Sequence, residues 1–231
     1  MRAYHLRTSR LRPALTLLAM LSAAAGSAAQ EGALSQLYAA RPPAGSSFVR
    51  VVNPLPTALR VRIADGPVQS IGAATPASSY AIVRGGRSFA VQVGGKPAAT
   101  LDVRPDSFST LVLRAEGAGY AFTTIDDTTD TQDALKAELR FYNLAAACAS
   151  AQLVLSPAGT PVLRDVAAGA SAARAVNPVR ATVAGRCGEA ASPALPLPPM
   201  QPGDHLSLFL TGSADKPVLS AQPSRTDPFT R

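Results

Sequence analysis

Histidine, cysteine and tryptophan are scarce in this chain of 231 residues. It has no tryptophan, two cysteines and two histidines. Of the two histidines, only His205 lies beyond residue 29. Acid–base catalysis most often uses histidine, while zinc and thiol redox sites need cysteine or histidine clusters at characteristic spacings. No such cluster and no Cys-x-x-Cys pair is present in the sequence. We therefore expect no catalytic residues, no metal site and no cofactor.

Motifs of nucleophilic catalysis are missing as well. The sequence contains no Gly-x-Ser-x-Gly and no glycine-rich phosphate loop followed by a helix. His205 follows Asp204, but the internal repeat described below aligns it with Phe108, and a position that accepts phenylalanine is interpreted as structural. The paired carboxylates Asp126 and Asp127 fall in a polar linker, where we expect both to be solvated.

The first 29 residues have the three regions of a secretory signal peptide. Four arginines precede an apolar run that ends in small residues at 27–29. This run is shorter than the roughly 20 residues of a membrane-spanning helix. We expect cleavage after about Ala29 and a mature protein outside the cytoplasm. Removing four of the 22 basic residues leaves 18 against 15 acidic ones, and this small excess predicts no nucleic-acid partner.

Strand patterns separated by glycine and proline fill most of the mature chain. Residues 58–63 alternate between apolar side chains and the two arginines Arg60 and Arg62, which is the period of a half-buried strand. Similar segments occur at 47–53, 87–93 and 108–114, with glycine pairs typical of hairpins between some of them. The pattern predicts an all-β protein.

An internal repeat divides these strands into two sets. With an offset of 90, residues 49–53 fall on 139–143 and residues 91–95 on 181–185. Further along, the offset grows to 97, and a proline-rich segment at 191–203 accounts for the added residues. The duplication predicts two tandem β-sandwich domains, at 34–125 and 134–222, preceded by an N-terminal arm at 30–46 and joined by a linker at 126–133.

The two cysteines fall in the second predicted domain. Cys148 follows the strand that ends near residue 143, and Cys187 lies in the turn after the strand at 181–185. Because export leads to an oxidising compartment, we expect a structural disulfide between them.

Arginine is the one reactive side chain in surplus. Arg60 and Arg62 project from one face of a strand, and Arg50 lies on the strand before it. Three guanidinium groups on one sheet face could bind carboxylates by paired hydrogen bonds. The alternative interpretation is a solvated outer face.

The segment at 37–53 resembles the AlgF family of periplasmic alginate biosynthesis proteins. The matching features are Leu-Tyr, a proline-containing arm, a Gly-Ser turn and a Phe-Val-Arg strand that ends in asparagine. They are carried by Leu37, Tyr38, Pro42, Pro43, Gly45, Ser46, Phe48, Val49, Arg50 and Asn53. Residues 139–143 and 174–179 look similar to the family too. The chain departs from the pattern in its proline-rich insertion around 191–202 and its cysteine pair.

The resemblance implies an accessory role in O-acetylation of the exopolysaccharide alginate. The expected function is that of a non-enzymatic adaptor for periplasmic and membrane-bound acetyltransferase proteins, which perform the transfer themselves. Two alternatives remain open, namely a module that binds the alginate polymer through Arg50, Arg60 and Arg62, and an acetyl-relay enzyme that uses a surface serine. The arm residues Leu37 and Tyr38 are further candidates for a partner contact.

Overall fold

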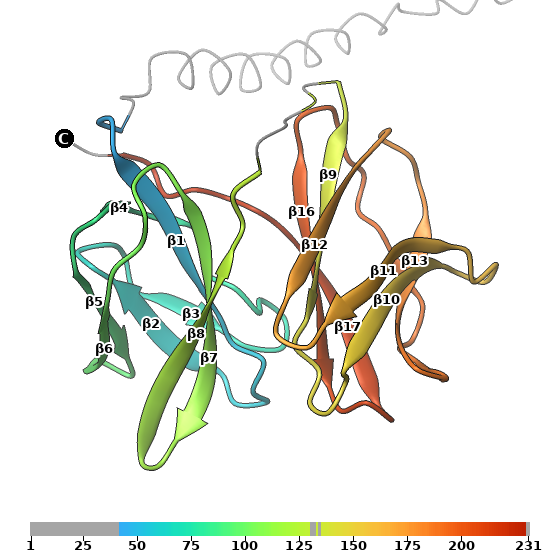
Figure 1. Ribbon diagram of the computed structural model, residues 1–231, viewed down its shortest axis with the longest axis horizontal. Coiled ribbons are helices and arrows are strands. Elements are labelled where there is room, and N and C mark those ends of the chain that lie inside the picture. Colours follow the sequence, from blue (N-terminus) through green and yellow to red (C-terminus); the bar gives the residue numbers. More distant parts are fainter. Residues whose placement is uncertain (1–41, 130–132, 134, 230–231) are drawn as a thin grey trace, which may run out of the picture. The chain divides into compact units, whose positions relative to one another are not determined.

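A computed structural model describes residues 42–129, 133 and 135–229 of the chain. Within these residues the regular elements are all strands (Figure 1). The first eight are β1 (Ser46–Val52), β2 (Leu59–Ile63), β3 (Gln69–Ile71), β4 (Ala81–Arg84), β5 (Phe89–Val93), β6 (Lys96–Leu101), β7 (Phe108–Glu116) and β8 (Gly119–Asp126). The others are β9 (Ala137–Asn143), β10 (Ser150–Leu155), β11 (Pro161–Ala167), β12 (Ser171–Val176), β13 (Thr182–Cys187), β14 (Ala190–Ala191), β15 (Leu195–Pro196), β16 (His205–Gly212) and β17 (Pro217–Pro223).

These strands form four sheets, two from each half of the chain. The first half has the sheets β4-β1-β7-β8 and β3-β2-β5-β6. The second half has β12-β9-β16-β17 and β11-β10-β13-β14, with β15 also paired to β13. Each pair of sheets encloses its own apolar core, so the predicted all-β fold with tandem β-sandwiches is confirmed.

The two sandwiches share the same strand order. In each, one parallel pair lies at the centre of a sheet, β1 with β7 and β9 with β16. Phe48 is opposite Phe108 in the first pair, and Glu138 is opposite His205 in the second. Glu138 follows Phe48 by 90 residues and His205 follows Phe108 by 97 residues, which are the offsets seen in the sequence. The matching register agrees with an internal duplication, which itself remains a prediction, as do the domain boundaries.

The central strands are buried on both faces. In β1, Val49 and Val51 point into the first core, while Arg50 and Val52 point the other way and are equally buried. A third apolar cluster covers that second face and draws residues from both sandwiches, namely Val52, Ala77, Val112, Ile125, Tyr142 and Phe209. The sheet containing β1 and β7 therefore packs against the sheet containing β9 and β16. We call this contact the sandwich interface.

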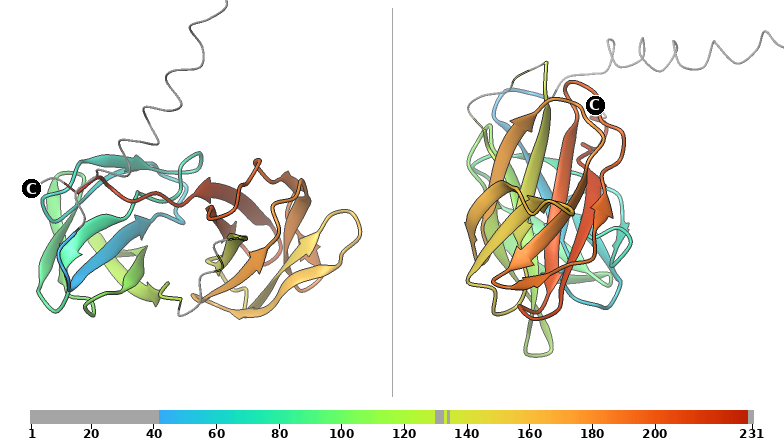
Figure 2. Two further views of the ribbon diagram at one scale, coloured as in Figure 1. Left: turned by 90° about the horizontal axis from the view of Figure 1, so that it is seen from above. Right: turned by 90° about the vertical axis from the view of Figure 1, so that its right-hand side faces the viewer.

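The C-terminal tail, residues 224–229, runs from β17 back to the first sandwich (Figures 1 and 2, red). Its backbone pairs with the residue just before β4: the amide of Tyr80 donates to the carbonyl of Arg225, and the amide of Asp227 donates to the carbonyl of Tyr80, both at 2.8 Å. The Gln222 side chain also exchanges two hydrogen bonds with the backbone of Ala77. Gln222 and the tail therefore connect the second sandwich to the residues before β4 in the first.

In the described part of the chain, no helix has the length and hydropathy needed to cross a bilayer.

The predicted disulfide between Cys148 and Cys187 is confirmed. The two Cα atoms are 5.8 Å apart, and Cys148 is fully buried in the second core. The bridge joins the loop after β9 to the end of β13 and closes a loop with a sequence separation of 39.

Removing this bridge should destabilise the second sandwich. The chain-entropy model gives a loss of up to about 4 kcal/mol for a loop of this size. We expect the variant with both Cys148→Ala and Cys187→Ala to unfold at lower denaturant concentration than the oxidised protein. A count of two free thiols in unfolded, unreduced protein would show that the bridge does not form in solution.

Candidate functional site

The sandwich interface changes character along its strands. At one end it is apolar, where the rings of Tyr142 and Phe209 stack with centroids 5.0 Å apart. In the middle it contains a buried polar network, and at the other end it opens into a pocket. Strand alternation produces this arrangement, because every second residue of β1, β7, β9 and β16 faces the interface.

Arg50 is the centre of the buried network. Its side chain is 1% exposed and donates four hydrogen bonds to hydroxyl groups. Nε donates to Thr110 Oγ1 at 2.8 Å, Nη2 to the Tyr142 hydroxyl at 2.6 Å and to Ser207 Oγ at 2.8 Å, and Nη1 to Ser224 Oγ at 3.4 Å. Because Thr110 belongs to the first sandwich and Tyr142, Ser207 and Ser224 to the second half, one guanidinium connects both.

Asp127 supplies the negative charge of the network. It is 5% exposed and accepts hydrogen bonds from the hydroxyls of Tyr80 and Tyr142, each at 2.8 Å, and from Thr110. All three partners are donors in these contacts, which suits an ionised carboxylate. Arg140 Nη1 lies 3.8 Å from Asp127 Oδ1. The carboxylate is therefore held by both sandwiches.

Burial and mutual charge shift the pKa values of this network. Burial opposes the charge of Arg50, but Tyr142, Tyr80 and Asp127 outweigh it, so the pKa of Arg50 lies above its ordinary value. Burial raises the pKa of Tyr142 to about 12 despite the nearby Arg50, and raises that of Tyr80 further. The guanidinium also lies 4.5 Å from the centroid of the Tyr80 ring, a cation–π contact. Arg50 therefore stays charged and both tyrosines stay neutral across physiological pH.

The open end of the interface is a pocket of about 260 Å³ with a charged lining. Glu138 Oε1 lies 3.2 Å from Arg140 Nη2 and 3.6 Å from His205 Nδ1. The contact with His205 is the main cause that lowers the pKa of Glu138, and the contact with Glu138 is the main cause that raises the pKa of His205. Tyr80 and Asp127 reach the same pocket from the buried network.

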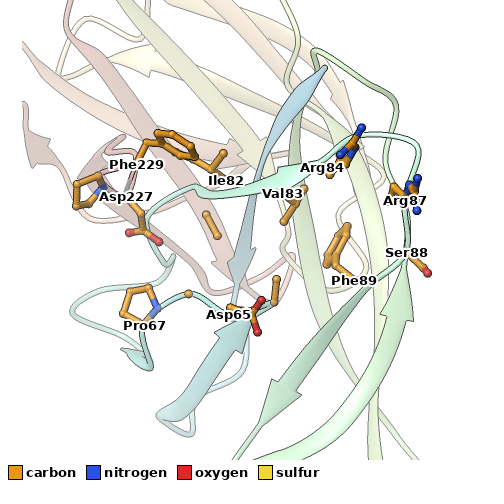
Figure 3. A pocket seen from close by; sticks show the side chains of 14 residues that line it. Asp65, Pro67, Ile82, Val83, Arg84, Arg87, Ser88, Phe89, Asp227 and Phe229 are labelled. Atoms are coloured by element: carbon orange, nitrogen blue, oxygen red, sulfur yellow. The ribbon is translucent and has the colours of Figure 1, made fainter. Parts of the chain in front are cut away.

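A second pocket, of about 460 Å³, lies beside β4 in the first sandwich. Figure 3 shows its lining, with Asp65 and Pro67 from the loop after β2, Arg84 at the end of β4, Arg87 from the β4–β5 turn, and Phe229 from the tail. Acidic and basic side chains stand apart on its rim, and no charged group of this pocket belongs to the buried network.

Two predictions about charged residues are wrong. Arg50 does not share a face with Arg60 and Arg62, because β1 and β2 belong to different sheets and Arg50 points into the sandwich interface. Arg60 and Arg62 lie on the exposed face of β2, so the expected face has two guanidinium groups rather than three. Asp127 is not solvated, because the second sandwich covers it.

Other predicted residues have different outcomes. Asp126 is exposed, as expected for a linker carboxylate. Leu37 and Tyr38 lie outside the described residues. Ser47 is buried and donates to the carbonyl of Arg104, which makes it a structural hydroxyl.

Sequence reasoning missed Tyr80, Thr110 and Tyr142, which complete the network around Arg50 and Asp127. A signal was present in the continuous run Phe-Val-Arg-Val-Val, since a strand without polar alternation is typically buried on both faces. An arginine inside such a run needs buried partners.

Two arrangements typical of catalytic sites are absent among the described residues. Within the part of the chain that the structure describes, no serine or threonine hydroxyl is hydrogen-bonded to His205, the pairing of a histidine-activated nucleophile. No group of three or more His, Cys, Asp or Glu side chains is placed to hold a metal ion within the same residues.

Comparisons with known proteins agree with the resemblance found in the sequence. A family model described as "Alginate O-acetyl transferase AlgF" matches residues 18–194. The alginate biosynthesis protein AlgF of Pseudomonas putida is 29% identical over 214 residues, which cover 91% of this chain and 94% of that protein.

Two solved structures were also matched. The C-terminal domain of AlgF from P. aeruginosa is 26% identical, with a TM-score of 0.34, and the match covers 38% of this chain and 98% of that domain. The carbohydrate-binding domain CBMbc of Amy13K from Eubacterium rectale, solved with maltoheptaose, is 10% identical, with a TM-score of 0.27 and coverage of 79% and 98%. TM-scores this low indicate neither a shared fold nor a shared ligand. The family model, in contrast, spans well over half of the sequence, and the chain therefore belongs to the AlgF family.

Proposed function

We propose that this protein is a periplasmic, non-enzymatic adaptor that takes part in O-acetylation of alginate by holding acetyl-transfer proteins together. Its family and its Pseudomonas putida relative carry the names of alginate acetylation and alginate biosynthesis. The observation that carries the adaptor role is the sandwich interface, where Arg50 and Asp127 bind hydroxyls from both halves. Two sandwiches joined in this way present two surfaces at a fixed spacing.

A fixed spacing suits an adaptor. Binding one partner to each sandwich converts their encounter into an intramolecular event and raises their effective concentration. The outer sheets, β3-β2-β5-β6 and β11-β10-β13-β14, do not take part in the sandwich interface. Each is therefore available to a partner, and the exposed Arg60 and Arg62 belong to the first of them.

Among the described residues, no serine or threonine hydroxyl is hydrogen-bonded to His205, and this supports the non-enzymatic role. An unactivated serine hydroxyl is a weak nucleophile at neutral pH. His205 faces Glu138 rather than a hydroxyl, and Ser47 is buried against a backbone carbonyl.

Deleting the gene should remove most acetyl groups from secreted alginate while polymer synthesis continues.

The purified protein should bind the acetyltransferase proteins of the same machinery, and alanine at Leu37 and Tyr38 should weaken this binding if the arm is a contact. Acetyl content of the polymer and pull-down with purified partners would measure the two effects. A stable acetyl adduct on the protein after incubation with an acetyl donor would instead support the relay enzyme, and normal acetylation in the deletion strain would contradict both roles.

A further inference from the structure

The outer edge of β4 has backbone groups that no described residue pairs with. β4 is the edge strand of its sheet, and β1 is the strand it pairs with. The amide of Gly85 donates to the carbonyl of Gly45, so the odd-numbered residues of this segment face β1. Alternation directs Ile82 and Arg84 the other way. Within the described ranges, the amides of Ile82 and Arg84 and the carbonyl of Ile82 therefore have no backbone partner.

The C-terminal tail shows that this edge accepts an extended segment. The tail pairs in parallel with Tyr80, whose amide and carbonyl face the same edge as those of Ile82. The pairing ends at Asp227, and no later described residue of the tail bonds to β4. The tail thus covers the position before β4 and leaves the edge of β4 itself open to another strand.

The pocket of about 460 Å³ lies beside this open edge (Figure 3). Its apolar lining includes Ala81, Val83 and Phe89, which belong to the first core and are at most 8% exposed. The volume lies in the range of roughly 300–1,000 Å³ that is usual for binding pockets. Because every second side chain of a strand points to the same face, a strand added to β4 would direct side chains into this pocket.

The second sandwich has a longer strand at the matching opening. β11 and β12 hold the places in its sheets that β3 and β4 hold in the first sandwich. β11 has seven residues and β3 only three. Arg174 on β12 donates to the carbonyl of Val162 on β11 at 2.9 Å, which joins the two edges. In the first sandwich, Gln69 on β3 bonds to Ser79, before β4 begins. The opening beside β4 is therefore not required by the fold.

Polar groups at the two ends of the pocket indicate what the added strand should carry. Asp227 Oδ2 is buried and has no hydrogen-bond partner among the described residues, although its Oδ1 accepts from the Ser79 hydroxyl. Arg84 and Arg87 are exposed at the opposite end (Figure 3), and neither forms an ion pair with a described residue. A complementary segment would place a hydrogen-bond donor near Asp227 and an acidic side chain near the arginines.

We propose that the β4 edge binds an extended segment of an acetyl-transfer partner by β-strand addition. The backbone of this segment pairs with Ile82 and Arg84. An apolar side chain of the segment fills the pocket against Val83 and Phe89, and an acidic side chain lies beside Arg84 and Arg87. Open amides and a carbonyl at strand spacing suit a polypeptide, which can supply matching backbone groups. The inference rests on the proposed adaptor role and locates the partner contact of the first sandwich.

Hydrogen exchange in the complex tests the mode of binding. The mature protein, residues 30–231, is mixed in turn with each purified acetyltransferase protein of the same machinery. For one of them, the amides of Ile82 and Arg84 should exchange at least about tenfold more slowly in the complex, because the added strand gives them acceptors. Exchange in β8, the opposite edge of the same sheet, should not change.

A proline variant tests the edge directly. Ile82→Pro removes the outward amide and should weaken binding of that partner about tenfold or more. The melting temperature should be preserved, because proline is tolerated on an edge strand where the amide does not face the neighbouring strand. The matched control is Thr124→Pro. The amide of Asp127 donates to the carbonyl of Phe108, so alternation turns the amide of Thr124 outward on β8, and this variant should bind like the parent.

A charge variant tests the pocket without changing the strand. Arg87→Glu, in the exposed turn after β4, should weaken binding severalfold by repelling the acidic side chain of the partner. Its control is Arg114→Glu, at the exposed end of β7, which should bind like the parent. This pair of variants decides the question even if Ile82→Pro proves less stable than the parent.

The possible failures can be told apart. If the parent binds a partner, but Ile82→Pro and Arg87→Glu bind it as tightly as their controls do, the β4 assignment is wrong and the adaptor role stands. If the parent binds no acetyltransferase protein, the adaptor role fails and the assignment fails with it. Slower exchange in β4 that depends on the concentration of this protein alone would assign the edge to a second copy of the chain and overturn the proposal.

Discussion

Replacing Arg50 by methionine should lower the free energy of unfolding by about 3–5 kcal/mol, the usual effect of removing one member of a buried charged network. The substitution deletes four hydrogen bonds and the positive charge nearest the two tyrosines. Asp127 would remain buried with only Arg140 nearby as a cation. Urea unfolding followed by circular dichroism measures the loss.

Two further variants separate this effect from simple loss of a side chain. Arg60→Met removes an arginine from the exposed face of β2 and should change stability by no more than about 0.5 kcal/mol. Combining Arg50→Met with Asp127→Asn removes both charges, so the double variant should lose less than the sum of the single losses. Equal losses for Arg50→Met and Arg60→Met would show that the network contributes little to stability.

Local patterns in the sequence predicted several elements of the fold. Alternation at Leu59, Val61 and Ile63 predicted β2 because one face of that strand meets the core and the other meets solvent. The repeat offsets predicted that both halves would contain similar strands, and the register of β1 with β7 matches that of β9 with β16 at the same offsets. The presence of two cysteines in a chain expected to be exported predicted the bridge between Cys148 and Cys187.

The sandwich interface could not be predicted in this way. Whether the second face of a strand is solvated depends on which other sheet packs on it, and no periodicity in β1 identifies that sheet. Asp127 illustrates the problem: it lies in a polar stretch, yet its hydroxyl partners are 47, 17 and 15 residues away. Two of these partners come from the first sandwich and Tyr142 comes from the second, so their approach results from long-range packing rather than from local sequence.

The tail that follows β17 is the other contact that fixes the two sandwiches together. Tyr80 exchanges backbone hydrogen bonds with Arg225 and Asp227, and the Ser79 hydroxyl donates to the Asp227 carboxylate. Ser224 accepts a hydrogen bond from Arg50. The tail therefore secures the edge of the first sandwich and also completes the buried network.

Truncation after Pro223 should destabilise the protein by about 3–9 kcal/mol, because six hydrogen bonds are lost and each contributes roughly 0.5–1.5 kcal/mol. The amide of Tyr80 loses its acceptor, so its hydrogen exchange should accelerate together with that of neighbouring β4. Thermal unfolding and hydrogen-exchange mass spectrometry measure the two effects.

A shorter truncation, ending at Phe229, provides the matched control because it keeps every one of these contacts. It should unfold like the full chain, within about 0.5 kcal/mol. If the longer truncation also left stability and exchange at Tyr80 unchanged, the tail would not hold the sandwiches together. The longer truncation could instead lower stability and prevent two partners from binding at the same time, while each partner still bound alone. That result would show that an adaptor role depends on the fixed spacing of the sandwiches.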